Sequence, residues 1–199
     1  PTRRFSDLKK RPFLFIPGFF VLSLIFSCSS ETDVPRPDFP RPDHVVIVVE
    51  ENHGFDQIMG SKYAPYINQL AGESAVFIHS HAITHPSQPN YMALFSGSRQ
   101  GVKDDECLPG KTPLTTPNLG AALLLAGLSF AGYSEGLPAT GSTVCSHQTT
   151  AGHQYARKHA PWVNWQGESI NGLPPFTNQP FSHFPGDLNE LPVLSFVIP

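Results

Sequence analysis

The chain has 199 residues, of which 13 are Lys or Arg and 16 are Asp or Glu, so its formal net charge is −3 at pH 7. Five basic residues and one acidic residue fall within the first 27, which leaves 8 basic and 15 acidic residues, a net charge of −7, in the remainder. A surface of that sign repels the phosphates of nucleic acids, so we expect no nucleic-acid partner. Composition also argues against disorder, because apolar runs recur between the 21 prolines and 16 glycines.

The amino-terminal segment has the pattern of a bacterial lipoprotein signal. Basic residues at positions 3–11 precede the apolar stretch 13–26, which is too short to span a membrane comfortably as a helix. The sequence Ile-Phe-Ser-Cys that ends this stretch resembles a lipobox. We therefore expect residues 1–27 to be a signal peptide and Cys28 to be the lipidated first residue of an extracytoplasmic, membrane-anchored lipoprotein of a bacterial cell envelope. An ordinary signal peptide or an uncleaved anchor is the alternative.

Two segments of different composition follow this signal. Residues 28–43 are rich in Ser, Pro and Asp and have almost no apolar side chain to bury, which is typical of a tether. Residues 44–199 are long enough to form the core of one domain. Two cysteines lie in this domain, Cys107 and Cys145, and outside the cytoplasm we expect them to form a disulfide.

Alternating apolar runs and Gly/Pro-rich loops predict an α/β fold. The β-branched run 45–49 is typical of a strand that is covered on both faces. Three further segments carry helix signals, such as a proline near the first turn of the helix or a glycine after its last turn. The expected strands are 45–49, 75–78, 128–133 and 193–198, and the expected helices lie within 64–74, 89–95 and 117–125.

Two segments carry residue types that suit phosphate chemistry. The first expected strand runs directly into Glu50, Glu51 and Asn52, and Ser87 stands just before an expected helix. In open α/β sheets, ligands bind beyond the carboxyl ends of the strands. There Glu51 could bind a divalent ion that acidifies the Ser87 hydroxyl, and the helix N-terminus favours an anion. On general grounds alone, Ser87 would be only a helix cap.

Four motifs in order give the chain a family resemblance. Residues 51–56 (ENHGFD), 87–91 (SQPNY), 133–138 (YSEGLP) and 155–162 (YARKHAPW) resemble segments of the bacterial phosphoesterase family. This family includes acid phosphatases and phospholipases C and is a branch of the alkaline phosphatase superfamily. The resemblance extends over residues 44–199 and implies an alkaline-phosphatase-like three-layer α/β/α sandwich.

The resemblance also implies an enzyme, a hydrolase of phosphoric esters that cleaves phosphate monoesters through a phosphoserine. Its cofactor would be a divalent metal ion of unknown identity. The implied roles are Ser87 as nucleophile, Glu51, Asn52 and Ser87 as metal ligands, and Asn90, Lys158 and His159 as substrate-binding residues. For Lys158 and His159, a solvated position on a surface loop is an equally good interpretation.

Two alternatives to a phosphomonoesterase stay open. One is a phospholipase C or other phosphodiesterase on the same fold, and the other is a surface-binding lipoprotein without catalytic activity. The sequence begins with Pro1 and ends at Pro199, directly after an expected strand, whereas the resemblance implies further Asp and His ligands beyond such a strand. We therefore expect a catalytic domain that is truncated at its C-terminus and inactive alone, because three ligands do not complete a divalent metal site.

Overall fold

A computed structural model of the chain describes residues 41–108 and 112–199. The expected signal peptide, the lipidation site Cys28 and most of the expected tether lie outside the described residues. Within the described part of the chain, no helix is long and apolar enough to cross a membrane.

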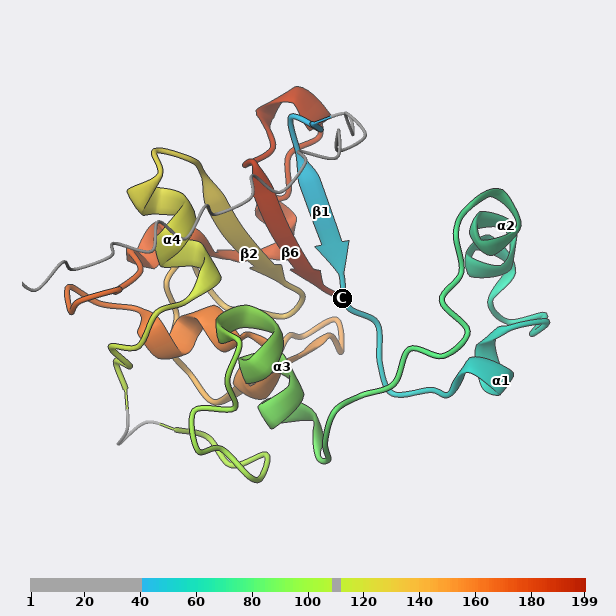
Figure 1. Cartoon of the computed structure of the whole chain (residues 1–199), viewed down its shortest axis with the longest axis horizontal. Helices are drawn as coiled ribbons and strands as arrows, with labels where there is room; N and C mark the ends of the chain where they lie inside the picture. The colour runs from blue at the N-terminus through green and yellow to red at the C-terminus, as the bar shows by residue number, and fades with distance from the viewer. Residues whose placement is uncertain (1–40, 109–111) are drawn as a thin grey trace, which may run out of the picture. The chain divides into compact units, whose positions relative to one another are not determined.

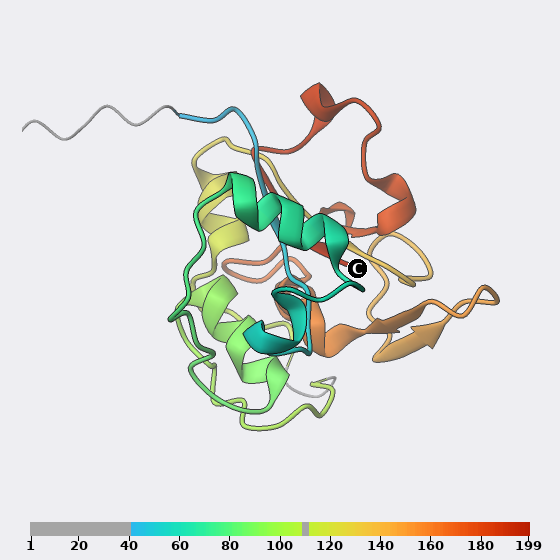
Figure 2. The same cartoon turned by 90° about the vertical axis from the view of Figure 1, so that its right-hand side faces the viewer.

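A parallel four-stranded sheet forms the centre of the domain (Figure 1). Leu194 pairs with Val45 on one side and with Phe130 on the other, so the last strand lies between two strands from earlier in the chain. A separate antiparallel pair projects from this body (Figure 2). The sheet order is β1 (Val45–Val48), β6 (Leu194–Ile198), β2 (Phe130–Ser134) and β5 (Asn178–Pro180), and the pair is β3 (Ser146–Gln148) with β4 (Gln154–Ala156).

Helices and short 3-10 turns connect these strands, which confirms the prediction of a mixed α/β fold. The local sequence explains where two of the helices stop and start. Gly97, with a φ of 68°, ends α3, and the side chain of Asn118 accepts the backbone N–H of Ala121 at the start of α4. The helices are α1 (Phe55–Ile58), α2 (Pro65–Glu73), α3 (Ser87–Ser96) and α4 (Leu119–Leu125), and the 3-10 turns are η1 (Arg157–His159), η2 (Pro161–Trp165), η3 (Pro175–Thr177), η4 (Phe181–His183) and η5 (Leu188–Glu190).

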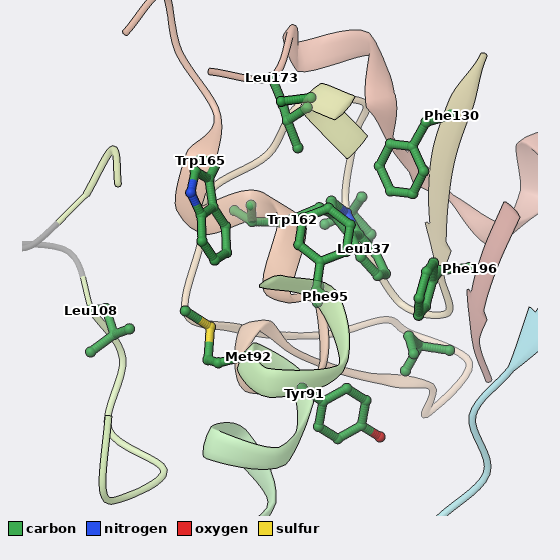
Figure 3. Close-up of a cluster of buried hydrophobic side chains, with 14 of the residues drawn as sticks. Tyr91, Met92, Phe95, Leu108, Phe130, Leu137, Trp162, Trp165, Leu173 and Phe196 are labelled. Atoms are coloured by element: carbon green, nitrogen blue, oxygen red, sulfur yellow. The ribbon is translucent and has the colours of Figure 1, made fainter. Parts of the chain in front are cut away.

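An aromatic cluster joins α3 to the sheet (Figure 3). Phe95 of α3 is 1% exposed, and its ring centroid lies 5.5–6.4 Å from those of four other aromatic rings. Two of these rings come from the central strands and two from η2: Phe130, Phe196, Trp162 and Trp165. Burial of such large side chains contributes strongly to stability, so this cluster fixes α3 against the sheet.

Two expectations about strands are wrong. Residues 75–78 form no strand, although all four are apolar and two are β-branched, because no strand within the described residues lies beside them to pair. The run 45–49 does form a strand, but it is not covered on both faces: Val45, Val46 and Val48 are 40–52% exposed. Among the described strands β1 lies at the edge of the sheet, which explains this exposure.

The segment between β1 and α3 stands apart from the sheet. Figure 1 shows α1 and α2 to one side of the strands and α3. Neither of these two helices contains a buried residue. The site described below is therefore shaped by the two ends of this segment rather than by its helices.

Gly132 in β2 provides a test of the packing. A Cβ atom at this position would overlap the indole ring of Trp162. We expect Gly132→Ala to destabilise the domain by about 3 kcal/mol, because the core cannot absorb the added methyl group. Urea unfolding followed by tryptophan fluorescence measures this change.

Gly72→Ala is the matched control for this substitution. Gly72 lies in α2 with open space around it, so alanine there should be neutral or slightly stabilising. Equal unfolding midpoints for Gly132→Ala and the unsubstituted protein would contradict the packing described here.

Candidate active site

The site begins with a contact between two segments 36 residues apart. Glu51 follows β1 at its carboxyl end, and Ser87 is the first residue of α3. The Ser87 hydroxyl donates a hydrogen bond of 3.1 Å to Glu51 Oε1. Sheet topology thus brings the expected nucleophile against the expected metal-binding carboxylate.

Ser87 does not cap its helix. The residue before the first helical turn is Pro86, and no side chain caps the helix there. The Ser87 hydroxyl faces Glu51 instead, which removes the interpretation of Ser87 as an ordinary cap. What remains is a hydroxyl at the positive end of a ten-residue helix.

His159 approaches the same carboxylate from η1. Its Nε2 lies 2.6 Å from Glu51 Oε1, and the two side chains are 20% and 28% exposed. Burial lowers the pKa of His159 below its usual value, although the Glu51 carboxylate opposes the shift. The imidazole is therefore largely neutral at pH 7.

Tyr91 completes this side of the site one turn further along α3. Its ring centroid lies 5.1 Å from that of His159, and the residue is 4% exposed. Burial raises the pKa of Tyr91 well above its usual value, and the nearby Glu51 carboxylate raises it further. The phenol thus keeps its proton, and its hydroxyl finds no hydrogen-bond partner within the described part of the chain.

Two hollows meet at Glu51, Asn52 and Tyr91, which line both of them. The larger has a volume of about 600 Å³ and contains Ser87. The smaller, of about 250 Å³, contains His159 and opens over the ends of β2 and β6. An ester could therefore have its phosphate beside Glu51 and its remaining atoms in either hollow.

Three oxygen donors of the site suit a hard divalent cation. Glu51 offers a carboxylate, Asn52 an amide and Ser87 a hydroxyl, and all three line the larger hollow. Within residues 41–108 and 112–199, no three His, Cys, Asp or Glu side chains gather closely enough to hold a metal ion. The donor types fit such an ion, and they supply only part of the six to eight ligands that Ca²⁺ or Mg²⁺ takes.

Asn90 holds the loop that precedes the expected nucleophile. Its Nδ2 donates to the carbonyls of Thr84 and Pro86, at 2.8 and 3.0 Å, and its Oδ1 accepts the N–H of Thr84 at 3.1 Å. Both amide hydrogens are therefore engaged. In this structure Asn90 therefore shapes the turn before Ser87.

Lys158 is bound to a partner that the sequence did not suggest. Its Nζ donates to Asp105 Oδ2 at 2.7 Å, and the backbone N–H of Gln88 donates to Asp105 Oδ1 at 2.9 Å. Although burial raises the pKa of Asp105, these two hydrogen bonds hold it below its usual value. Asp105 therefore lies as a carboxylate between α3 and η1.

The two domain cysteines are joined. Cys107 and Cys145 form a disulfide with a Cα–Cα distance of 5.7 Å. The backbone N–H of Arg157 donates to the Cys145 carbonyl at 3.0 Å, so the bridge links the loop containing Asp105 to the start of η1.

Three polar residues of the site were assigned no role from the sequence. Tyr91 belongs to the SQPNY motif, which was the available signal for it. Asp105 lies in the acidic run before Cys107, and nothing in that run distinguishes it from its neighbours. Glu135 follows β2, lines the smaller hollow, and its carboxylate lies 2.8 Å from His153 Nδ1.

Comparisons with known proteins find phosphatases among the proteins similar to this chain. The chain is 50% identical over 162 residues to a phosphatidylinositol-3-phosphatase of Mycobacterium tuberculosis, which covers 80% of this chain and 50% of that protein. It is 29% identical over 189 residues to a probable acid phosphatase of Kluyveromyces lactis, which covers 89% of this chain and 43% of the relative. A phosphate-repressible acid phosphatase of Penicillium chrysogenum is 29% identical over 135 residues, 67% of this chain and 32% of the relative.

The chain thus spans about half the length, or less, of these curated relatives. No solved structure gives a significant match. The model of the Phosphoesterase family matches residues 61–199, which include the helix that begins at Ser87 and the turn that contains His159. The chain therefore belongs to the Phosphoesterase family.

Proposed function

We propose that the protein hydrolyses phosphate monoesters through a phosphoserine at Ser87. The observation that carries the proposal is the 3.1 Å hydrogen bond between the Ser87 hydroxyl and Glu51 at the positive end of α3. A hydroxyl at a helix N-terminus, in contact with a carboxylate, suits attack on an anionic phosphate ester. The acid phosphatases among the relatives support the same reaction class.

The reaction has two halves in this proposal. Ser87 Oγ forms a bond to phosphorus as the bond from phosphorus to the leaving alcohol breaks, and the alcohol takes up a proton. Water then breaks the phosphoserine bond, which releases phosphate and restores the hydroxyl. His159 is largely neutral and lies beside Glu51, so its imidazole is placed to take or give a proton during these steps.

Glu51, Asn52 and the Ser87 hydroxyl would hold a divalent metal ion as part of its ligand set. When bound, such an ion supplies charge stabilisation to the transferring phosphoryl group and lowers the pKa of the serine hydroxyl. The neighbouring residues orient the reacting groups: Asn90 fixes the turn before Ser87, and Tyr91 offers a protonated phenol near Glu51.

The class of ester is proposed from the lining of the larger hollow and from one relative. Val49, Ile83 and Leu94 give this hollow an apolar wall next to Ser87, which suits an ester with an apolar part. The relative that is 50% identical is named as a phosphatidylinositol-3-phosphatase. We therefore propose a phosphoinositide monoester as the first substrate to test, ahead of soluble monoesters and of diesters.

The architecture and the location of the protein are also proposals. The parallel order β1-β6-β2-β5 with α3 and α4 packed beside it supports an alkaline-phosphatase-like three-layer sandwich. The basic and apolar amino-terminal sequence supports a lipoprotein anchored through Cys28. A phosphatase held at a membrane surface would meet lipid esters there.

Ser87→Ala tests the nucleophile. In the complete protein we expect it to lower kcat for a chromogenic phosphomonoester by about 10³-fold or more, because the covalent route is lost. Ser182→Ala, at an exposed position, is the matched control and should retain normal turnover. A Ser87→Ala variant with nearly normal kcat would remove Ser87 from the mechanism.

Glu51→Gln tests the metal-binding carboxylate. Because an amide binds hard cations more weakly than a carboxylate, we expect a weaker apparent metal affinity, by about tenfold or more, and partial recovery of activity at high divalent-ion concentration. Titration of chelator-treated protein with Mg²⁺, Mn²⁺ or Ca²⁺ measures this affinity.

Glu190→Gln is the control, because it removes an exposed carboxylate that lines neither hollow and should leave the metal affinity within about twofold. Full activity of the unsubstituted protein after exhaustive chelation would show that the proposed metal has no role.

Cys28→Ala tests the anchor. Two acyl chains attach a protein stably to a membrane, so the variant should move from the membrane fraction to the soluble fraction or retain its signal peptide. Fractionation after a high-salt wash and amino-terminal sequencing measure both outcomes, with Ser29→Ala as control. Normal processing and continued membrane association of Cys28→Ala would identify the segment as a different kind of signal.

A further inference from the structure

The Asp105 carboxylate connects the two elements that carry Ser87 and His159. Its Oδ1 accepts the backbone N–H of Gln88 at 2.9 Å, and its Oδ2 accepts Lys158 Nζ at 2.7 Å. Gln88 directly follows Ser87, and Lys158 directly precedes His159. One carboxylate thus binds both α3 and η1 next to their reactive residues.

Glu51 forms a second connection between the same two elements. Glu51 Oε1 accepts the Ser87 hydroxyl at 3.1 Å and lies 2.6 Å from His159 Nε2. The contacts therefore close into a ring, which we call the positioning ring. Its members, in order, are Ser87, Glu51, His159, Lys158, Asp105 and Gln88.

The loop that carries Asp105 is itself firmly held. The side chain of Gln88 is 2% exposed, and its Nε2 donates to the carbonyls of Asp104 and Glu106, at 3.1 and 2.9 Å. The disulfide from Cys107 then ties the end of this loop to Cys145. These neighbours fix Asp105 on both sides, so its carboxylate can hold Gln88 and Lys158 at defined positions.

We propose that Asp105 is a positioning residue that holds Ser87 and His159 in register through Gln88 and Lys158. The inference rests on the proposed function and adds a residue that does not itself touch the substrate. Lys158 in this view acts through Asp105 rather than by binding phosphate. Misplacement of a reacting group by 1 Å can cost about 10²-fold in rate, so a loosened ring should lower kcat more than it changes KM.

Two substitutions at Asp105 separate its two hydrogen bonds. Asp105→Ala removes both and should lower kcat by about 10- to 100-fold, with KM within about threefold. Asp105→Asn keeps an oxygen for the Gln88 N–H but loses the charge that faces Lys158, so its kcat should fall between those of Asp105→Ala and the unsubstituted protein. The assay uses the complete protein with a chromogenic monoester.

Lys158→Met and the double variant test whether the two residues act as a unit. If Lys158 acts through Asp105, the double variant should lose little more kcat than Asp105→Ala alone, because the coupling is already broken. Glu168→Gln and Lys103→Met are the matched exposed controls for the two charge changes, and both should leave kcat and KM unchanged.

Each other outcome overturns the inference. Normal kcat in Asp105→Ala excludes a positioning role, and Asp105→Asn applies the same test if the alanine variant fails to fold. A raised KM with unchanged kcat in Lys158→Met would show that Lys158 binds substrate directly. Additive losses in the double variant would separate the two residues. Loss of activity in Ser87→Ala together with normal Asp105 variants would overturn only this inference, whereas an active Ser87→Ala would overturn the proposed function.

Discussion

The site depends on the contact between the Ser87 hydroxyl and the Glu51 carboxylate. Glu51 follows the end of a strand and Ser87 begins a helix, so neither element by itself determines the distance between the two side chains. The contact requires β1 to lie parallel to β6 and α3 to pack across the sheet, so that the carboxyl end of the strand meets the first turn of the helix. A parallel sheet favours this arrangement because it gathers strand ends along one edge.

The aromatic cluster is what holds α3 in that position. Phe95 lies two turns beyond Ser87 and is packed among rings from β2, β6 and η2. A close-packed interior has little free space to absorb a displacement. A shift of these rings would therefore move α3 as a rigid body. The absence of a side chain at Gly132 leaves the space that Trp162 fills, which connects the sheet to the turn next to η1.

Polar contacts then set the positions of the site residues more closely than the packing of the core does. The Tyr91 ring packs against the His159 ring, which contacts Glu51, and the carboxylate of Asp105 joins α3 to η1. These groups are partly or fully withdrawn from water, where hydrogen bonds and charges act more strongly than at a free surface. The same withdrawal shifts the pKa of His159 downward and keeps the imidazole neutral beside a carboxylate.

The sequence by itself determined the mixed α/β class, the family and a helix close after Ser87, and it singled out Glu51 as a candidate, because these follow from local periodicity and from contiguous motifs. It could not show that residues 75–78 lack a strand partner or that β1 is exposed, since pairing and burial depend on neighbours far along the chain. Only the tertiary structure decided what Asn90 and Lys158 bind and brought in Asp105, whose partners lie 17 and 53 residues away. The physical reason is that a side chain's role is set by the groups that fold against it, and those contacts are not local in sequence.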